Sequence, residues 1–190
     1  MKLEKYLLPL LLLPAACGDD EPVEDVDPEE VITTVELTLT DGTETLTATW
    51  RDLDGEGPGD PVITPPAPLA AGTTYDLQLT FLNETESPAE DVTEEIQEEA
   101  EEHQVLMIPS SDFLTATPTD VESDYVANSV GDDLPVGLTW SVQTDAAGTG
   151  TLRVVLKHLP PVGGTPQKTA DVGLADGGTD ADVSFDLVVE

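Results

Sequence analysis

The chain has 190 residues, enough for one domain and a targeting segment. Six Lys and Arg residues stand against forty Asp and Glu residues, which gives a formal net charge of −34. Nucleic acids and anionic lipid headgroups are bound through Lys and Arg, so this charge excludes both as binding partners of the surface. The charge attracts cations or basic partners, and it also suits solubility in a salty habitat, where salt screens self-repulsion.

The N-terminus predicts a lipid anchor. A short basic start, Lys2 and Lys5, precedes the apolar run YLLPLLLLPAA, which is too short to span a bilayer and ends in small residues before Cys17. This arrangement resembles a bacterial lipoprotein signal peptide, although Pro14 stands where a Leu is usual, three residues before the cysteine. We expect a signal peptide over residues 1–16 and a lipidated Cys17 that holds the protein on the membrane. The alternative is an ordinary secretory signal with an incidental cysteine. Cys17 is the only cysteine, which excludes an intrachain disulfide.

Residues 17–30, CGDDEPVEDVDPEE, are acidic and almost free of large apolar side chains, so we expect a disordered tether. An acidic stretch directly after a lipidated cysteine also resembles the surface-export signal of lipoproteins from Bacteroidetes-like bacteria. The expected location is therefore the cell envelope, as an outer-membrane lipoprotein that faces the periplasm or is exposed at the cell surface.

From residue 31 to residue 190 apolar and polar residues alternate, which is the period of half-buried strands. The alternating segments are VITTVELTLT, TLTATW, TYDLQLTFL, GLTWSVQT, TLRVVLKH and DVSFDLVVE, with QVLMIP and SDYVANSV as further strand candidates. The pair Asp41–Gly42 predicts a tight turn between the first two strands. One apolar and one polar face per strand predicts a mainly β fold, an antiparallel two-sheet sandwich (Ig-like) of seven to eight strands.

The loop RDLDGEGPGDP, which follows the second predicted strand, contains four carboxylates. Asp52, Asp54 and Glu56 have the i, i+2, i+4 spacing of oxygen-rich calcium loops, and Asp60 could supply a later ligand. The loop resembles the DxDGDGxxD pattern of adhesive repeat modules, but it lacks flanking helices and the Glu at the twelfth position. It is therefore either a structural calcium site or a solvated turn, since an acidic chain produces this spacing by chance.

One segment, SPAEDVTEEIQEEAEEH, predicts an inserted acidic α-helix over about residues 88–102. Ser87 is the expected N-cap, and Glu90 closes a capping box. The apolar stripe is narrow and the remaining faces are nearly all carboxylate; the stripe consists of Val92, Ile96 and Ala100. Like charges four residues apart destabilise a helix, so packing, salt or bound cations must offset the repulsion.

The only two histidines end apolar series, His103 on the helix stripe and His158 on the inward face of its strand. Glu99 and His103 have the i, i+4 spacing of metal ligands on a helix. If helix and strand end at the same side of the sandwich, His103, His158 and Glu99 predict a site for a zinc- or copper-type ion. The alternative is two partly buried histidines that are hydrogen-bonded to nearby carboxylates.

Hydrolytic chemistry has little support in the sequence. No serine stands in a GxSxG motif, no Gly-rich phosphate loop opens a helix, and aromatic residues, the usual platforms of sugar sites, make up 4% of the chain. We therefore predict that the protein is not an enzyme.

The whole layout resembles a group of small Bacteroidetes-type outer-membrane lipoproteins labelled "type 1 periplasmic binding fold superfamily". The segments that carry the resemblance are VITTVELTLT, TWRDLDGEG, LNETESPAEDVTEEIQEEAEEHQ, LKHLP and DVSFDLVVE. The resemblance implies no established activity. The label of this group implies two long α/β lobes, in which helices alternate with strands. This sequence predicts one clear helix, so we favour the sandwich.

These observations predict a lipid-anchored, cell-envelope binding protein that captures a cation or a metal-bearing ligand and cooperates with an outer-membrane receptor or transporter. The alternative is a structural or adhesion module in which calcium stabilises the loop from Asp52 to Asp60 and no specific small molecule is bound. The two differ in whether the histidines or the loop bind metal.

Overall fold

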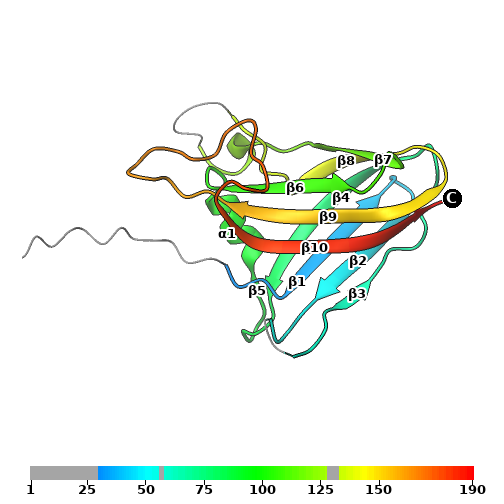
Figure 1. The fold of residues 1–190 in the computed structure, drawn as a ribbon, viewed down its shortest axis with the longest axis horizontal. Helices are drawn as coiled ribbons and strands as arrows, with labels where there is room; N and C mark the ends of the chain where they lie inside the picture. The colour runs from blue at the N-terminus through cyan, green and yellow to red at the C-terminus, as the bar shows by residue number, and fades with distance from the viewer. Residues whose placement is uncertain (1–29, 56–57, 128–132) are drawn as a thin grey trace, which may run out of the picture.

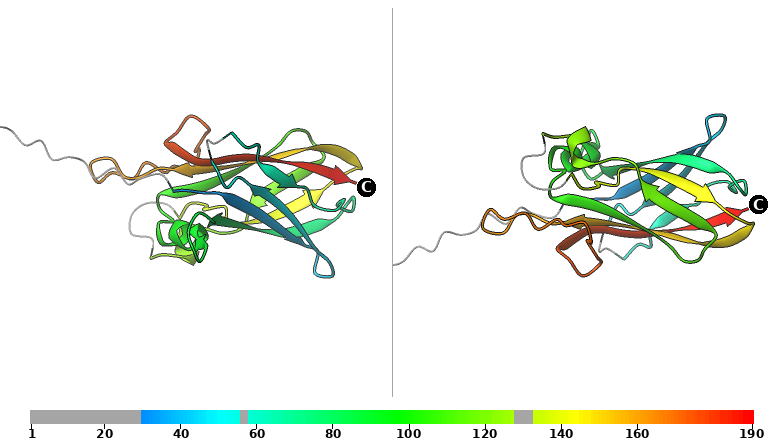
Figure 2. Two further views of the ribbon diagram at one scale, coloured as in Figure 1. Left: turned by 90° about the horizontal axis from the view of Figure 1, so that it is seen from below. Right: turned by 90° about the horizontal axis from the view of Figure 1, so that it is seen from above.

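The structure is a computed structural model that describes residues 30–55, 58–127 and 133–190. Within these residues ten strands form two antiparallel sheets, one seven-stranded and one three-stranded. Figure 1 shows the smaller sheet lying in front of the larger one, and the edge-on views of Figure 2 show the two layers packed face to face. The predicted antiparallel two-sheet sandwich is confirmed.

The larger sheet has the order β3-β2-β1-β4-β8-β7, and β5 pairs with β4 beside this path. Its strands are β1 Thr34–Thr40, β2 Thr45–Arg51, β3 Val62–Thr64, β4 Thr74–Asn83, β5 Glu90–Asp91, β7 Leu114–Pro118 and β8 Thr139–Thr144. The predicted turn at Asp41–Gly42 joins β1 to β2, and Asp41 Oδ1 accepts hydrogen bonds from the backbone N–H groups of Thr43 and Glu44, both at 2.8 Å. This local hydrogen bonding sets the β1–β2 register.

The smaller sheet has the order β10-β9-β6 and carries the two histidines. Its strands are β6 His103–Pro109, β9 Gly148–His158 and β10 Gly178–Val189. In Figure 1, β6 and β10 begin, and β9 ends, at the same end of the sandwich, far from the C-terminus. This common end positions the candidate site.

The core lies between the sheets and follows the predicted alternation. The inward residues of the six alternating segments are at most 8% exposed, with two exceptions: Trp50 is partly buried and Val31 is 59% exposed. The largest fully buried side chains include Phe81, Phe185, Leu37, Leu77 and Leu156. Burying one such side chain contributes roughly 1.5–3 kcal/mol, so a one-residue register slip that turned a strand over would be costly. The two-residue period therefore determines which face of each strand enters the core.

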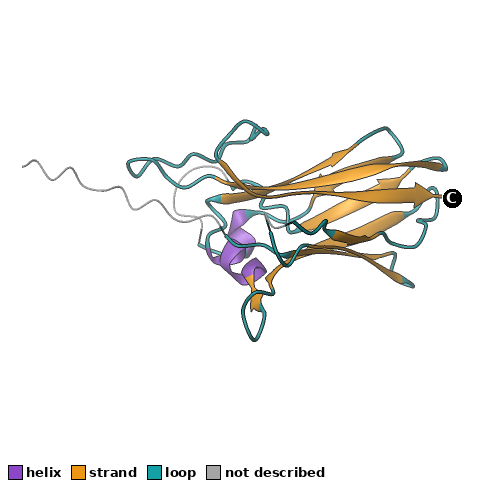
Figure 3. Ribbon diagram, turned by 60° about the horizontal axis from the view of Figure 1, so that its bottom comes forward, coloured by secondary structure: helices purple, strands orange, loops and turns teal. Residues whose placement is uncertain are grey.

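The helix is shorter than predicted: α1 spans Val92–Glu98 rather than residues 88–102. Its N-cap is Asp91, whose carboxylate accepts a hydrogen bond from Thr93 N at 3.1 Å, so the expected capping box at Ser87 is wrong. Pairing of β5 with β4 keeps the preceding residues extended, and pairing of β6 with β9 begins at residue 103. The predicted stripe of Val92, Ile96 and Ala100 is nevertheless buried. Figure 3 shows this helix at the end of the sandwich opposite the C-terminus.

Two further expectations need correction. The candidate strand SDYVANSV is not a strand where it is described, since the 3₁₀ turn η1, Glu122–Asp124, covers its first two residues. Residues 128–132 lie outside the described residues. The predicted tether, residues 17–30, includes one described residue, Glu30, and its side chain is only 5% exposed. Cys17 and the signal peptide lie outside the described residues. None of the helices among the described residues is both long and apolar enough to cross a membrane.

Candidate metal centre

The two histidines face each other across neighbouring strands. His103 opens β6, His158 closes β9, and the two are direct partners in the register. Leu159 N donates to Glu102 O at 2.7 Å, so Glu102 and Leu159 form a hydrogen-bonded pair of the antiparallel ladder. The next pair, His103 and His158, is therefore a non-hydrogen-bonded pair, in which side chains are closest. Their rings stack with centroids 4.6 Å apart and planes 13° apart. The structure therefore brings together the two histidines predicted to share a site.

A β-bulge adds a carboxylate from β10. Thr179 pairs with Lys157 and Ala181 with Leu156, which leaves Asp180 as the extra residue between them. A bulge re-aims side chains, and here the Asp180 side chain is fully buried, with Oδ2 3.8 Å from His103 Nε2 and Oδ1 4.0 Å from His158 Nδ1. Strict alternation along DADVSF gives no signal of this placement, because an ideal strand would point Asp180 outward.

Glu30 adds the fourth side chain, from the segment that leads into β1 of the other sheet. Its Oε1 lies 3.0 Å from His103 Nε2, and its Oε2 lies 3.9 Å from His158 Nδ1. Glu30 therefore reaches across the sandwich to the small sheet. Sequence reasoning missed this residue because it belongs to a run of carboxylates that reads as a solvated tether.

The four side chains can converge on one ion. Each offers a ligand atom, and these atoms lie within 4.8 Å of one another. A tetrahedral zinc ion with ligand distances of about 2.0–2.1 Å holds its ligand atoms about 3.3–3.4 Å apart, and the nitrogen–oxygen contacts of 3.0 to 4.0 Å lie around this value. An imidazole lone pair lies in the ring plane, so the stacked rings must tilt to aim at one ion. Rotation about χ2, which is a soft torsion, does this without moving the strands.

Glu99 acts through its backbone rather than its carboxylate. His103 Nδ1 lies 3.3 Å from the carbonyl oxygen of Glu99, which can only accept, so Nδ1 carries a proton and Nε2 faces the carboxylates of Glu30 and Asp180. A metal-bound histidine commonly donates its other N–H in this way. The predicted role of Glu99 as a ligand is not what the structure shows, because α1 ends at Glu98 and His103 belongs to a strand. The Glu99 carboxylate lies 4.0 Å from Nδ1, the nitrogen on the other side of the ring.

The electrostatics of the cluster favour a bound positive charge. Burial raises the pKa of Glu30, but the His103 ring 3.0 Å away outweighs it and lowers that pKa to about 2. Burial likewise lowers the pKa of His103, but the nearby carboxylates of Glu30 and Asp180 outweigh it, and the net shift is upward. The four basic side chains of the described residues are engaged elsewhere: Arg51 with Glu84, Arg153 with Asp182, Lys157 with Thr179 and Lys168 with Glu122. The cluster thus holds a proton on His103 or a cation.

Several buried polar atoms of the cluster have unused hydrogen-bonding capacity. Within the described part of the chain, Glu30 Oε2 and His158 Nε2 are buried and make no hydrogen bond, and His103 Nε2 has the contact with Glu30 Oε1 at 3.0 Å. Buried polar atoms nearly always have a partner, and an exception indicates a functional role or a bound ion. The short approach of His103 to Glu30 also fits the alternative prediction, a histidine that is protonated and paired with a carboxylate. The cluster can therefore exist in a protonated or a metal-bound form.

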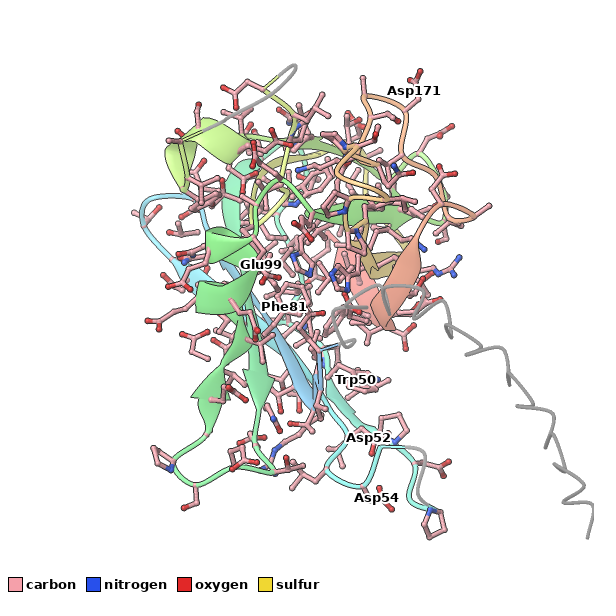
Figure 4. All side chains as sticks on the ribbon, turned by 90° about the vertical axis from the view of Figure 1, so that its left-hand side faces the viewer. Trp50, Asp52, Asp54, Phe81, Glu99 and Asp171 are labelled. Carbon is pink, nitrogen blue, oxygen red and sulfur yellow. The ribbon has the colours of Figure 1, made fainter. Side chains whose placement is uncertain are left out.

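The predicted calcium loop does not gather its carboxylates where it is described. Asp54 Oδ2 accepts a hydrogen bond from Gly59 N at 3.1 Å, and Asp52 Oδ1 accepts one from Asp54 N at 3.3 Å. Among the described residues, Asp52, Asp54 and Asp60 do not form a group of three ligand atoms close enough for one ion, and Glu56 lies outside the described residues. Figure 4 shows Asp52 and Asp54 well away from Glu99 and the helix. The loop is separate from the histidine cluster.

Comparisons with known proteins add no assignment. No family model, curated protein or solved structure matches this chain. Function must therefore be argued from the cluster itself.

Proposed function

We propose that the protein is a lipid-anchored cell-envelope protein that binds one divalent transition-metal ion at Glu30, His103, His158 and Asp180. The observation that carries the proposal is the convergence of these four ligand-type side chains within 4.8 Å of one another in a buried position. Two carboxylates and two neutral imidazoles carry a charge of minus two, which a divalent ion neutralises. Burial makes that neutralisation valuable, because isolated charges are costly in a low-dielectric interior.

The donor set favours zinc or copper over calcium. Imidazole nitrogen suits zinc and copper, whereas calcium takes six to eight oxygen ligands. With four protein ligands and side chains at most 5% exposed, the site resembles closed four-coordinate zinc sites, which bind metal without leaving a position for a substrate. This supports a binding role and agrees with the expectation that the protein is not an enzyme.

Calorimetric titration of the full, metal-free chain with Zn²⁺ and with Cu²⁺ tests the proposal. We expect one ion per chain, with binding strongly weakened in Asp180→Asn. Asp186→Asn is the matched control, since it makes the same chemical change on the same strand at an exposed, outward position, and it should bind as the wild type does. Absence of binding heat above buffer, or equal binding by the Asp180 and Asp186 variants, would show that the cluster is only a proton-sharing pair of histidines and carboxylates.

The anchor and the partner belong to the same proposal. Lipidation of Cys17 would hold the metal site near the membrane, and the acidic surface would raise the local concentration of cations. An outer-membrane receptor or transporter would take up the bound metal. Metabolic labelling with a fatty acid tests the anchor: label and membrane association should be present in the wild type and lost in Cys17→Ser.

A further inference from the structure

Three of the four cluster side chains belong to one rigid unit. His103, His158 and Asp180 lie on β6, β9 and β10, which are neighbours in the three-stranded sheet. The histidines are register partners, and the bulge that carries Asp180 is enclosed by the pairs Thr179–Lys157 and Ala181–Leu156. The backbones of these three residues are therefore held by pairing within one sheet.

The fourth side chain is held differently. Glu30 precedes β1, and the first cross-strand hydrogen bonds of its segment among the described residues are those of Thr33: Thr33 N donates to Leu82 O at 2.9 Å and Thr33 O accepts from Asp52 N at 2.8 Å. Thr33 is 3% exposed, whereas Val31 is 59% exposed. The chain is therefore fixed at Thr33, while Val31 is exposed and Ile32 packs against the core only in part. Glu30 can withdraw by movement of this short segment, at the cost of at most the Ile32 contact, while both sheets stay intact.

Burial makes that withdrawal necessary for exchange of an ion. The side chains of His103 and Asp180 are 0% exposed and that of His158 is 3% exposed, so an ion among them has no direct contact with solvent. Glu30 is the ligand that comes from outside this sheet, and it is 5% exposed. Removing its carboxylate would leave two imidazoles and one carboxylate, with a fourth position open to water or to a ligand from another molecule.

We propose that Glu30 is the gating ligand, meaning the ligand whose departure opens the site for loading and release of the metal. The inference rests on the proposed metal site. Glu30 is the last residue of the predicted tether, so its displacement would open the metal site at the start of the described chain. A receptor that offers its own ligand to the open position would then promote metal transfer.

Rates of metal exchange distinguish a gating ligand from an ordinary one. The test uses the full chain, with Zn²⁺ association followed by stopped flow and dissociation followed by mixing the loaded protein with an excess of a coloured chelator. Glu30→Ala is compared with Asp180→Ala, which also removes one carboxylate and so matches the loss of charge. We expect Glu30→Ala to raise the association rate constant, because the site stays open, and to raise the dissociation rate constant by a larger factor, because a ligand is also lost. Asp180→Ala should raise only the dissociation rate constant.

A second measurement follows the segment itself. Hydrogen exchange at the amides of residues 31 and 32 should slow when Zn²⁺ is added to the wild type and should not respond to Zn²⁺ in Glu30→Ala. If the wild type does not bind Zn²⁺ or Cu²⁺, the proposed function is wrong and the gating role falls with it. If the wild type binds metal but Glu30→Ala changes neither rate constant, or changes only dissociation as Asp180→Ala does, metal binding stands and the gating role is refuted.

Discussion

Gly177 lies where the long connection after β9 returns to start β10, and its substitution gives the sharpest test of how the fold builds the cluster. Its φ is +57°, a conformation that costs residues with a side chain about 1–2 kcal/mol. A Cβ atom there would lie 2.2 Å from the carbonyl oxygen of His158 and 2.7 Å from Leu159 Cδ2. The first of these atoms is backbone and cannot rotate away, so Gly177→Ala must displace either the His158 end of β9 or the strand that carries Asp180.

Gly163 is the matched control because its φ is also +57° and a Cβ there would meet nothing within 4 Å. Gly163→Ala should therefore cost only the backbone term, about 1–2 kcal/mol. Gly177→Ala adds the cost of forcing an atom into a packed site, typically about 1–3 kcal/mol, for a total of about 2–5 kcal/mol. Any gain from restricting the unfolded chain is the same for both and cancels in the comparison.

The assay is urea unfolding of the metal-free chain at one pH, followed by tryptophan fluorescence from Trp50 and Trp140, with Zn²⁺ titration of the same proteins. Gly177→Ala should lose more stability than Gly163→Ala by about 1–3 kcal/mol. It should also bind Zn²⁺ more weakly, whereas Gly163→Ala should bind as the wild type does. Equal destabilisation by the two variants would show that the close approach to His158 is relieved at no cost. Unchanged Zn²⁺ binding in Gly177→Ala would refute its role in positioning the cluster.

Three other outcomes are expected. In the metal-free chain the raised pKa of His103 contributes stability that is fully present below pH 6.5 and is lost as pH rises through the pKa of the folded state. The lowered pKa of Glu30 contributes stability that is present above pH 4.5 and is lost as pH falls through about 2. Urea unfolding across this range should therefore show a loss of stability above pH 6.5 that Glu30→Gln reduces. Lys168→Met should destabilise the protein by about 3–5 kcal/mol, because it removes the lysine that lies 3.0 Å from the buried Glu122 carboxylate. Adding Glu122→Gln should restore part of this loss, and equal stability of the single and double variants would contradict the reasoning. Calcium should change the melting temperature no more than magnesium does, because Asp54 already accepts a hydrogen bond from Gly59. A calcium-specific rise in melting temperature that Asp54→Asn abolishes would instead support the calcium loop.

The strands were predictable because their evidence is local. Alternation of apolar and polar residues identified six of the seven longer strands and the inward residues of each, from Val35 in β1 to Val189 in β10. The candidate QVLMIP, a short apolar run, corresponds to the seventh, β6. The short strands β3, β5 and β7 were missed, since a strand of two to five residues contains too few alternations to stand out from a loop. The helix was found but its ends were not, because pairing of β5 and β6 with strands distant in sequence overrode the helical preference of the flanking residues.

The fold class, the acidic character and the place of both histidines at the ends of apolar series follow from the sequence alone, since composition and a two-residue period require no knowledge of distant contacts. Which carboxylates lie beside the histidines depends on contacts between strands distant in sequence. Asp180 turns inward through a bulge that exists only because β10 pairs with β9, and Glu30 arrives from a segment more than seventy residues away from His103 along the chain. With forty acidic residues, spacing along the chain cannot single out two of them, and three-dimensional packing selects the pair.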